Sequence, residues 1–400
     1  MKVLFVCHRF PYPPIRGGKI RPFNIIRHLG AQAEVTVASL VRSAAERAAG
    51  EGLAAHCKRF IAEPVGSFAA GLRMVARLPT PAPSSFGYFH SPGLAARIRA
   101  ELATGSYDLV FVHCSSVAPY VAGHTGAVKV LDYGDMDSEK WAMYAQERPF
   151  PLSAGYWLES VKLRRVEREL ARRFDLCTCT TRAELDTLES LGTARRSGWF
   201  PNGVDTGFFQ PSVTAYDPDL VCFSGRMDYF PNQQAVERFV GNVLPLIRAR
   251  RPATRFVVVG AEPPPSIRRL AGQPGITVTG TVKDVRPHVQ QAAVSIAPLD
   301  VARGTQNKIL ESMAMGVPVV CTSLAARGVD AEPGLHLLTA DEPADFAAAV
   351  LSLLADPGKR AAMAQRGRER VLSHHSWAGS LRKLDGLLAE ALGARRAAVA

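Results

Sequence analysis

Short apolar runs alternate along the chain with longer stretches in which apolar residues recur every three or four positions. The first run, 2–7, is followed by a loop with three prolines, a helical pattern that ends near Gly30, and a second apolar run, 34–39. The alternation continues through the apolar runs 107–114, 127–135 and 174–181. Strands that alternate with helices are typical of a parallel sheet with helices on both faces. The first half of the chain therefore predicts such a sheet.

The same rhythm begins again after a segment rich in Pro, Asn and Gly at 199–211. Its apolar runs lie at 220–225, 255–260, 275–280, 293–298 and 317–322, and helical patterns follow at 343–356, 358–374 and 376–392. The pattern predicts an α/β protein with two Rossmann-like, doubly wound domains, 1–200 and 201–375, and a helix in 376–400 that returns to the first domain. Ligands of such sheets bind beyond the carboxyl ends of the strands, so two sheets that face each other would form a central cleft.

The segment 303–320 (RGTQNKILESMAMGVPVV) carries the most informative chemistry. A helix that begins near Thr305 has a polar stripe and an opposite apolar face, and Gly316 ends it before a short buried strand. The polar stripe holds Gly304, Asn307, Lys308 and Glu311.

A lysine in the first turn of a helix is unfavourable by roughly a few tenths of a kcal/mol, because the N-terminus carries partial positive charge. A bound anion reverses the sign of this interaction. Backbone N–H groups from Thr305 to Asn307, together with the Lys308 ammonium, would supply donors for one or two phosphoryl groups. Glu311 could then accept hydrogen bonds from the hydroxyls of a ribose. The alternative is a solvated helix face on which Lys308 and Glu311 form an ion pair.

Gly225 and Arg226 directly follow the strand-like run 220–225. A glycine at this place lets the backbone approach a ligand, and a following arginine can bind a diphosphate through its planar fork. The alternative is an arginine on a surface turn. Asp228 and Asn232 are expected in a turn and at a helix cap.

Three further residues follow strands of the first half. Gly17 and Gly18 open the first helix after a long loop, which could rest against a phosphate or form an ordinary flexible turn. His113 ends a strand, so its imidazole could receive a proton from an acceptor hydroxyl. A histidine that is hydrogen-bonded within the fold is an equal alternative.

Asp135 and Asp137 mimic a DxD motif, which would imply Mg²⁺ or Mn²⁺ on a nucleotide-sugar. Asp137 and Ser138 also suit the cap of the helix that follows. We therefore retain Asp135 as a site candidate and expect no metal.

The basic helix at 159–175 could touch an anionic membrane through its arginines, although a solvated face with Glu-to-Arg pairs is the simpler interpretation. Its expected buried side consists of Val161, Leu163, Val166, Leu170 and Phe174.

The net charge of +12 favours anionic partners, but the composition makes this weak evidence. Arginine provides 38 of the 48 cations and the chain is rich in alanine, a bias that a GC-rich genome also produces. No nucleic-acid-reading motif is present, so we expect no nucleic acid partner. The seven cysteines lack CxxC spacing, which favours reduced core residues. No apolar run is long enough to span a membrane, so we expect a cytoplasmic protein, with the inner face of the cell membrane as a further location.

Three motifs resemble those of the retaining glycosyltransferases of family four, which have the GT-B fold: PNGVDTGFF, GRMDYFPN and GTQNKILESMAMGVPVV. The whole chain is similar to the sugar transferases associated with bacterial exopolysaccharide and PEP-CTERM systems. The resemblance implies transfer of a sugar from a UDP- or GDP-sugar to a hydroxyl, with retention at the anomeric carbon. It implies a lipid-linked oligosaccharide or polysaccharide acceptor and no essential metal or other cofactor.

The resemblance also assigns roles to single residues. Arg226 would contact the donor diphosphate, Glu311 would hold the ribose as the second glutamate of an ExxxxxxxE motif, and Lys308 would reach the leaving phosphate. Two positions depart from the family. Arg303 replaces the first glutamate of that motif, and Asn232 replaces a lysine common six residues after the arginine. Lys308 would then take over the lost positive charge.

Two rival functions remain open at this point. A nucleotide-sugar epimerase would use the same two-domain fold and would release a nucleoside diphosphate and a changed sugar without an acceptor. A catalytically silent sugar-nucleotide-binding partner is suggested by Arg303.

Overall fold

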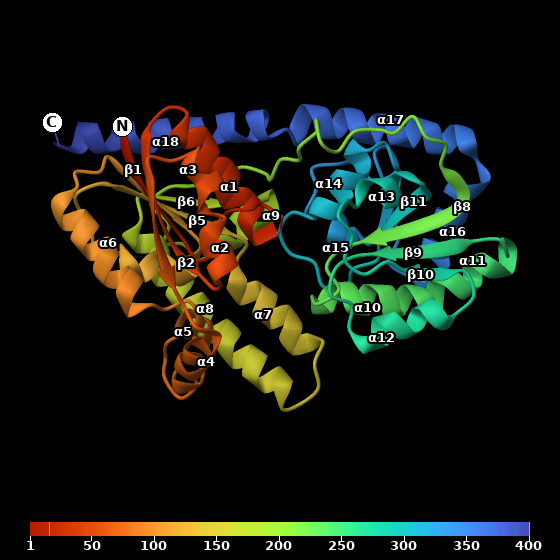
Figure 1. Cartoon of the computed structure of the whole chain (residues 1–400), viewed down its shortest axis with the longest axis horizontal. Coiled ribbons are helices and arrows are strands. Elements are labelled where there is room, and N and C mark those ends of the chain that lie inside the picture. Colours follow the sequence, from red (N-terminus) through yellow and green to blue (C-terminus); the bar gives the residue numbers. More distant parts are fainter. Residues whose placement is uncertain (16, 400) are drawn as a thin grey trace. The chain divides into compact units, whose positions relative to one another are not determined.

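Two parallel β-sheets organise the chain (Figure 1). The computed structural model describes residues 1–15 and 17–399, and the side chains of these up to residue 397. The chain forms two units: unit 1 comprises Met1–Pro201 and Leu381–Ala400, and unit 2 comprises Asn202–Ser380. The prediction of an α/β protein with two Rossmann-like parallel-sheet domains is confirmed.

Unit 1 contains a seven-stranded sheet with the order β3-β2-β1-β4-β5-β6-β7. Its strands are β1 (Lys2–Cys7), β2 (Glu34–Val41), β3 (Arg59–Pro64), β4 (Leu109–His113), β5 (Val128–Gly134), β6 (Leu176–Cys179) and β7 (Ser197–Trp199). Its helices are α1 (Gly17–Gly30), α2 (Ala44–Ala48), α3 (Gly50–Ala54), α4 (Ser67–Ala76), α5 (Ser84–Tyr88), α6 (Pro92–Thr104), the 3₁₀ helix η1 (Ser115–Tyr120), α7 (Asp137–Gln146), α8 (Leu152–Arg173) and α9 (Arg182–Ser190).

Unit 2 contains a six-stranded sheet with the order β10-β9-β8-β11-β12-β13. Its strands are β8 (Asp217–Ser224), β9 (Arg255–Val259), β10 (Ile276–Val278), β11 (Ala292–Ala297), β12 (Val319–Cys321) and β13 (Leu338–Thr339). Its helices are α10 (Phe230–Arg238), the π-helix η2 (Phe239–Val243), α11 (Leu244–Arg250), α12 (Pro265–Arg269), the 3₁₀ helix η3 (Leu270–Gly272), α13 (Arg286–Gln290), α14 (Asn307–Ala314), α15 (Ser323–Ala326), α16 (Pro343–Ala355) and α17 (Pro357–His374).

The final helix, α18 (Trp377–Val399), enters unit 1 at Leu381. There the Nε2–H of His28 in α1 donates a hydrogen bond to the Asp385 carboxylate at 2.8 Å, and Arg395 donates to the carbonyl oxygen of Ala127 at 2.9 Å. The helix is thereby bound to α1 and to the residue that precedes β5. Within the described residues, no helix is long and apolar enough to cross a membrane.

Each sheet has its topological switch point at its centre. The chain leaves β1 toward β2 and β3 on one side, and it later adds β4 to β7 on the other side. In unit 2, β8 and β11 are the corresponding neighbours. A crevice forms outside the carboxyl ends of two such strands, because the connections that follow them diverge to opposite sides. The residues after β1, β4, β8 and β11 are therefore the first place to look for a site.

Three strands were not predicted from the sequence, and each lies at the edge of a sheet. They are β3, β7 and β13. Edge strands need not be apolar on both faces, so they lack the continuous apolar run that marks a central strand. The strand β3, with the sequence RFIAEP, has exposed residues at both ends.

The predicted buried side of α8 is wrong at Val161, whose side chain is 48% exposed. The inward face of this helix instead includes two glutamates. Glu159 accepts hydrogen bonds from the backbone N–H groups of Ser84 and Ser85 at 2.9 and 2.8 Å, and Glu167 accepts from that of Ser138 at 3.0 Å. Burial raises the pKa of Glu167 to about 7. These carboxylates satisfy buried backbone donors that have no partner in secondary structure, which apolar side chains could not do.

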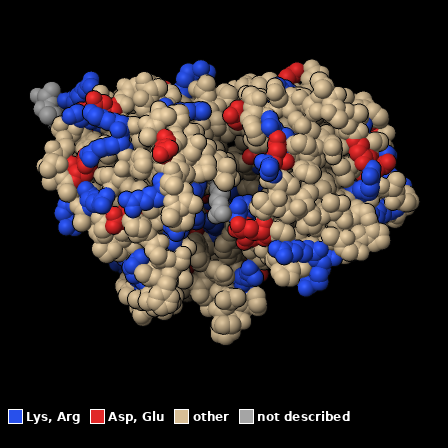
Figure 2. Space-filling view, viewed as in Figure 1, with Lys and Arg blue, Asp and Glu red and all other residues tan. Residues whose placement is uncertain are grey.

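The solvated face with Glu-to-Arg pairs is present only in part along α8. Glu169 pairs with Arg173, both about half exposed, whereas Glu159 and Glu167 are turned inward. On the face shown in Figure 2, Lys and Arg side chains are spread over the surface and clearly outnumber Asp and Glu on the part that belongs to unit 1.

Candidate active site

The loop after β8 brings Gly225 against the start of α14. A Cβ atom at Gly225 would lie 2.8 Å from the Asn232 amide nitrogen and 3.3 Å from the Nζ of Lys308. The backbone φ angle of Gly225 is +156°. Gly225 therefore allows these two side chains to approach the end of β8, and any larger residue would displace them.

Lys308 is held by Asn232 at this position. Its Nζ donates a hydrogen bond to the Asn232 Oδ1 at 2.5 Å, and it lies 4.5 Å from the centre of the Phe223 ring. The Asn232 amide in turn donates to the carbonyl oxygen of Arg226 at 2.7 Å. The structure thus brings Lys308 to the residue that replaces the family's lysine. If Lys308 replaces the family's lysine in function, its ammonium must lie near position 232, and this contact places it there.

Burial acts on both ionisable groups of α14. It lowers the pKa of Lys308 to about 7, and it raises the pKa of Glu311 to about 7. The charge of Glu311 counteracts the shift of Lys308, and the charge of Lys308 counteracts that of Glu311. The alternative of a close Lys308–Glu311 ion pair is nevertheless not present, because among the described residues no carboxylate forms an ion pair within 4 Å of the Lys308 ammonium. The cation therefore has a neutral amide and an aromatic ring as neighbours. An anion bound beside it would offset the cost of its burial.

The turn before α14 carries polar atoms that the protein does not use. The helix begins at Asn307, two residues later than predicted, and Gly304 adopts a positive φ of 61°. The Oγ1 of Thr305 and the Oδ1 of Asn307 are buried and have no hydrogen-bond partner among the described residues. Arg303 is half-buried, and its carbonyl oxygen accepts from the Gln306 side chain at 3.1 Å. Buried polar groups without a partner favour a ligand at this turn.

Arg226 is bound by two carboxylates. Its guanidinium donates to Asp228 at 2.8 and 3.0 Å and to Glu262 at 2.6 Å, and these acceptors raise its pKa. The prediction of Asp228 as a turn or cap residue misses this contact, and Asn232 lies within the first turn of α10 rather than at its cap. Glu262, with a positive φ of 56°, was not found from the sequence. A diphosphate would have to replace one of these carboxylates on the arginine.

In unit 1, a row of polar side chains crosses three central strands. His113 of β4 is the register partner of Asp132 of β5, which is the partner of Thr178 of β6. The His113 Nδ1 lies 2.7 Å from an Asp132 carboxylate oxygen, and the Thr178 hydroxyl donates to Asp132 at 2.9 Å. The Nδ1 of His113 therefore carries the proton, which leaves its Nε2 as the basic nitrogen when the ring is neutral.

Asp132 is the residue of this row that the sequence did not reveal. It is fully buried, and it accepts two hydrogen bonds of 2.8 Å from the buried Arg21 of α1. Burial alone would raise the pKa of Asp132, but Arg21 and His113 hold it well below its usual value. A charged residue inside the apolar run 128–134 was the available signal, because such a residue needs a buried partner.

His8, which follows β1, lies beside this row. Its ring centre is 5.8 Å from that of His113, and its Nδ1 is 3.3 Å from the Cys114 sulfur. Burial and the neighbouring Arg9 lower the pKa of His8 well below its usual value. His8 is therefore neutral at physiological pH.

The structure separates the roles of the two aspartates of the DxD-like motif. Asp135 is half-buried and accepts a hydrogen bond from the Thr180 hydroxyl at 2.7 Å. Asp137 is the first residue of α7 and makes no capping bond, while the Ser138 hydroxyl donates to Glu167, so the predicted cap is wrong. Among the described residues, no group of three or more His, Cys, Asp or Glu side chains could hold a metal ion.

Gly17 and Gly18 form the first turn of α1. A Cβ atom at Gly18 would meet only the Arg9 side chain, at 3.5 Å, which is an ordinary contact. The protein itself therefore does not need a glycine at position 18.

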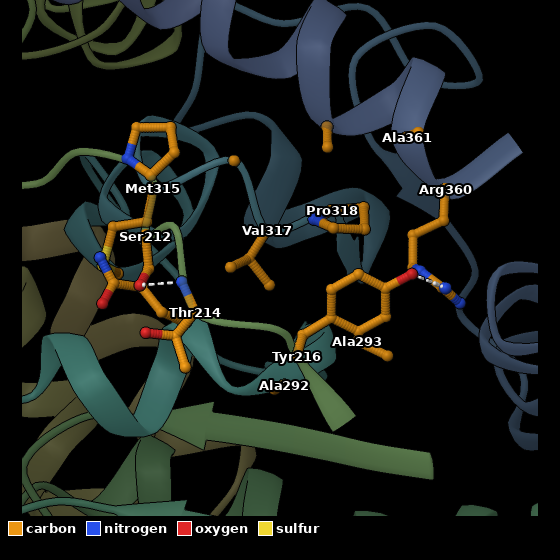
Figure 3. A pocket seen from close by; sticks show the side chains of 14 residues that line it. Ser212, Thr214, Tyr216, Ala292, Ala293, Met315, Val317, Pro318, Arg360 and Ala361 are labelled. Carbon is orange, nitrogen blue, oxygen red and sulfur yellow. Dashed lines mark hydrogen bonds between the residues drawn. The ribbon is translucent and has the colours of Figure 1, made fainter. Parts of the chain in front are cut away.

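A small pocket of about 180 Å³ lies at the other end of the unit 2 sheet, by the amino ends of β11 and β12 (Figure 3). Tyr216 and Arg360 face each other at this pocket, with the guanidinium 4.4 Å from the ring centre. Arg360 also donates to the carbonyl oxygen of Leu353 at 2.9 Å. The pocket is distinct from the candidate site, because it lies at the opposite end of the strands. Its arginine and tyrosine already contact each other.

Comparison with known proteins decides the family. Residues 15–208 match the model described as Glycosyltransferase Family 4, and residues 218–356 match the model described as Glycosyl transferases group 1. The chain belongs to this glycosyltransferase family. Its two matched regions fall in unit 1 and unit 2, apart from the last few residues of the first.

Individual relatives agree with this assignment. Over 341 residues the chain is 27% identical to a GDP-mannose-dependent alpha-(1-6)-phosphatidylinositol monomannoside mannosyltransferase of Mycolicibacterium smegmatis, covering 77% of this chain and 82% of the relative. Sucrose-phosphate synthase from Thermosynechococcus elongatus superposes with a TM-score of 0.72 and 16% identity, covering 98% and 100%. The Anabaena protein HepE, in complex with UDP and glucose, superposes with a TM-score of 0.69 and 16% identity, covering 97% of this chain and 99% of HepE. The structural neighbours show the GT-B fold.

Substitution of Gly18 by alanine separates stability from activity. Because the added methyl group has room in a helix, we expect the free energy of unfolding to stay unchanged or to rise by up to about 1 kcal/mol. If a substrate phosphate packs against this turn, glycosyl transfer should fall by on the order of tenfold or more. Urea unfolding and an assay of transfer measure the two effects. The control is Gly386→Ala in α18, where nothing lies within 4 Å of the new Cβ and transfer should not change.

Proposed function

We propose that the protein is a retaining glycosyltransferase that moves a sugar from a nucleoside-diphosphate donor to a hydroxyl acceptor in exopolysaccharide biosynthesis. The observation that carries this proposal is the half-buried Lys308 ammonium, which has no carboxylate partner and lies at the carboxyl end of β8. A diphosphate is the anion that best fits a cation, an adjacent arginine and the N-terminus of α14.

Each polar group near Lys308 then has a role in donor binding. The Lys308 ammonium neutralises the phosphate that leaves, and the Thr305 hydroxyl and the N–H groups of the turn bind its oxygens. Arg226 exchanges one of its carboxylate partners for the other phosphate. Glu311, one turn further along α14, accepts from the ribose hydroxyls. These cationic and N–H groups meet the charge of the diphosphate, so the proposed reaction needs no essential metal.

The acceptor hydroxyl loses its proton during transfer. His113 is the proposed base, since Asp132 fixes its Nδ1–H and leaves Nε2 free to accept a proton. Asp135 is a second candidate, and the departing phosphate itself is a third. No protein nucleophile is assigned. We propose that the acceptor oxygen attacks the anomeric carbon on the same face from which the diphosphate leaves, and this geometry retains the anomeric configuration. A lipid-linked oligosaccharide or polysaccharide is the proposed acceptor.

The choice of donor follows from the relatives. The mannosyltransferase of Mycolicibacterium smegmatis is named as GDP-mannose-dependent, and the Anabaena protein binds UDP. We therefore propose a UDP- or GDP-sugar as the donor of this chain.

The decisive experiment incubates the purified protein with UDP-, GDP- and ADP-linked glucose and mannose, with and without candidate acceptors. We expect release of one nucleoside diphosphate, and proton NMR should show a product with the anomeric configuration of the donor. Release of UDP or GDP with an isomerised free sugar and no acceptor would indicate an epimerase. A donor that raises the melting temperature but is never turned over would indicate a silent binding partner.

Moving the lysine from position 308 to position 232 tests whether Lys308 replaces the family's lysine. We expect Lys308→Ala to lower kcat/KM by on the order of 100-fold, because a positive charge at the leaving phosphate is lost. The double variant Asn232→Lys/Lys308→Ala should recover at least about tenfold of this loss, since the new ammonium starts from the adjacent position. Circular dichroism verifies the fold of each variant. If kcat/KM of the double variant is lower than that of Lys308→Ala, because the effects of the two substitutions multiply, the proposed replacement of one lysine by the other is contradicted.

The affinity for UDP or GDP should depend on pH through Lys308. Burial places its pKa at about 7 in the free protein, and a bound diphosphate stabilises the charged form and raises this pKa. Affinity should therefore decrease as the pH rises above 7, by up to about tenfold per unit, with proton uptake on binding. Titration calorimetry in two buffers measures both effects. Lys308→Arg should remove the part of this dependence that comes from Lys308, because arginine stays charged. Glu311, whose pKa is also about 7, binds ribose hydroxyls in its charged form and so contributes with the opposite sign. An unchanged slope in the Lys308→Arg variant would assign the proton uptake to another group.

A further inference from the structure

Exposed apolar side chains are concentrated in two segments of unit 1. Among the described residues, ten of the eighteen large apolar side chains that are exposed lie between residues 68 and 78 or between 150 and 161. Phe68 and Phe150 are each 82% exposed, and Trp157 is 61% exposed. We call this set the apolar surface: Phe68, Leu72, Met74, Val75 and Leu78 in and after α4, and Phe150, Leu152, Trp157, Leu158 and Val161 in and before α8.

Polar contacts hold the two segments together. Lys162 of α8 donates to the carbonyl oxygens of Arg77 and Leu78 at 3.3 and 2.7 Å, and Glu159 accepts from the N–H groups that open α5. In Figure 1, α4, α5 and α8 lie together at the lower end of unit 1. The apolar residues of both segments therefore belong to one part of the surface. A patch of this kind on a soluble domain marks an interaction site.

The exposed charges of α8 beside the apolar surface are mostly positive, with Glu169 as its exposed carboxylate, and Glu147 lies close to Phe150 at the end of α7. The glutamates Glu159 and Glu167 of α8 are buried, whereas Arg164, Arg165 and Arg168 are exposed and form no ion pair among the described residues. The segment 65–90 contains Arg73 and Arg77 but no Asp or Glu. In Figure 2 the lower part of unit 1 is mostly tan, with blue and little red. This surface would bind a partner that is apolar inside and negatively charged outside.

A large pocket adjoins the apolar surface. It has a volume of about 1030 Å³ and is formed by the segment from Arg77 to His90, by α6, by η1 with the residues after it, and by Val166 of α8. Its arginines and histidines are Arg77, Arg99, His90 and His124, and no carboxylate is among its lining residues. Phe86, Leu102 and Pro119 supply apolar walls.

The pocket has a positive environment. Burial and the charges of Arg77 and Arg73 lower the pKa of His90, and burial and Lys129 lower that of His124. A phosphate would relieve this repulsion, and an alkyl or glycerol group could contact the apolar walls.

We propose that unit 1 docks on an anionic lipid bilayer through the apolar surface, with a lipid phosphate headgroup in the adjoining pocket. The apolar side chains enter the boundary between headgroups and acyl chains, Trp157 lies at the level of the headgroups, and the arginines face the anionic lipids. This inference names the place of the reaction proposed above, but it does not depend on transfer chemistry, because bilayer binding needs neither donor nor acceptor.

Charge selects the bilayer over a second copy of this chain. A symmetric dimer through this surface would bring two sets of unpaired arginines together, in a chain with a net charge of +12. An anionic bilayer instead attracts each of these cations to its surface.

Flotation of the full chain with phosphatidylglycerol vesicles and with phosphatidylcholine vesicles at low salt tests the proposal. We expect binding to the anionic vesicles only. The double variant Phe68→Ser/Trp157→Ser should reduce this binding by on the order of tenfold, because two exposed aromatic side chains no longer insert. The matched control is Leu246→Ser/Leu372→Ser in unit 2, which removes two apolar residues that are each 43% exposed and should have no effect. Equal binding by both double variants would overturn the apolar surface as the docking face.

A second pair of variants tests the pocket. Arg77→Gln/Arg99→Gln should reduce binding to phosphatidylglycerol vesicles by on the order of tenfold, and millimolar inorganic phosphate should not replace the lipid. The control Arg269→Gln/Arg366→Gln removes the same net charge from unit 2 and should have a smaller effect. Equal losses in the two pairs would show that only diffuse charge matters. Sedimentation velocity that shows a dimer dissolved by Phe68→Ser/Trp157→Ser would assign the surface to a second copy. Intact bilayer binding without any sugar transfer would refute the proposed function alone.

Discussion

The burial of one cation without a carboxylate partner is the constraint on which the candidate site depends. Lys308 lies in the first turn of α14, where the helix dipole is unfavourable for a cation, and its ammonium donates a hydrogen bond to the neutral amide of Asn232. Burial makes the charged form of Lys308 less favourable and lowers its pKa to about 7. Since a buried charge without a counter-charge lowers the stability of the folded protein, such a group is retained where a ligand uses it.

Unit 1 provides the contrast that makes this argument specific. Asp132 is also charged and buried, but it has Arg21, Thr178 and His113 around it, and its pKa is held well below the usual value. A carboxylate compensated in this way can serve as a structural anchor that orients His113. Lys308 forms no ion pair with a protein carboxylate, so an external anion can supply its counter-charge, whereas Asp132 already has its counter-charge in Arg21. The two buried charges therefore have different tasks.

The sequence revealed the central strands, since continuous apolar runs can be recognised one strand at a time. It also placed Gly225, Lys308 and His113 after strands, which parallel topology brings to one edge of each sheet. It did not reveal Asp132, Glu262 or three of the four edge strands, β3, β7 and β13. Those depend on register and on loop geometry: Asp132 meets His113 only because the two residues pair across β4 and β5. Contacts between distant segments leave little trace in either segment alone.

If Lys308 supplies the cation of the donor site, as proposed above, its contact with Asn232 means that the site keeps a positive charge although the motif has changed. A lysine in α10, as the family resemblance expects, would reach the end of β8 from one side, and Lys308 reaches it from α14 on the other. Gly225 makes both routes possible, because its missing side chain leaves space that the Nζ of Lys308 borders. The position of the ammonium group, rather than the position of the lysine in the sequence, is then the quantity that donor chemistry constrains. A motif that lacks its lysine thus need not indicate a site that lacks its cation.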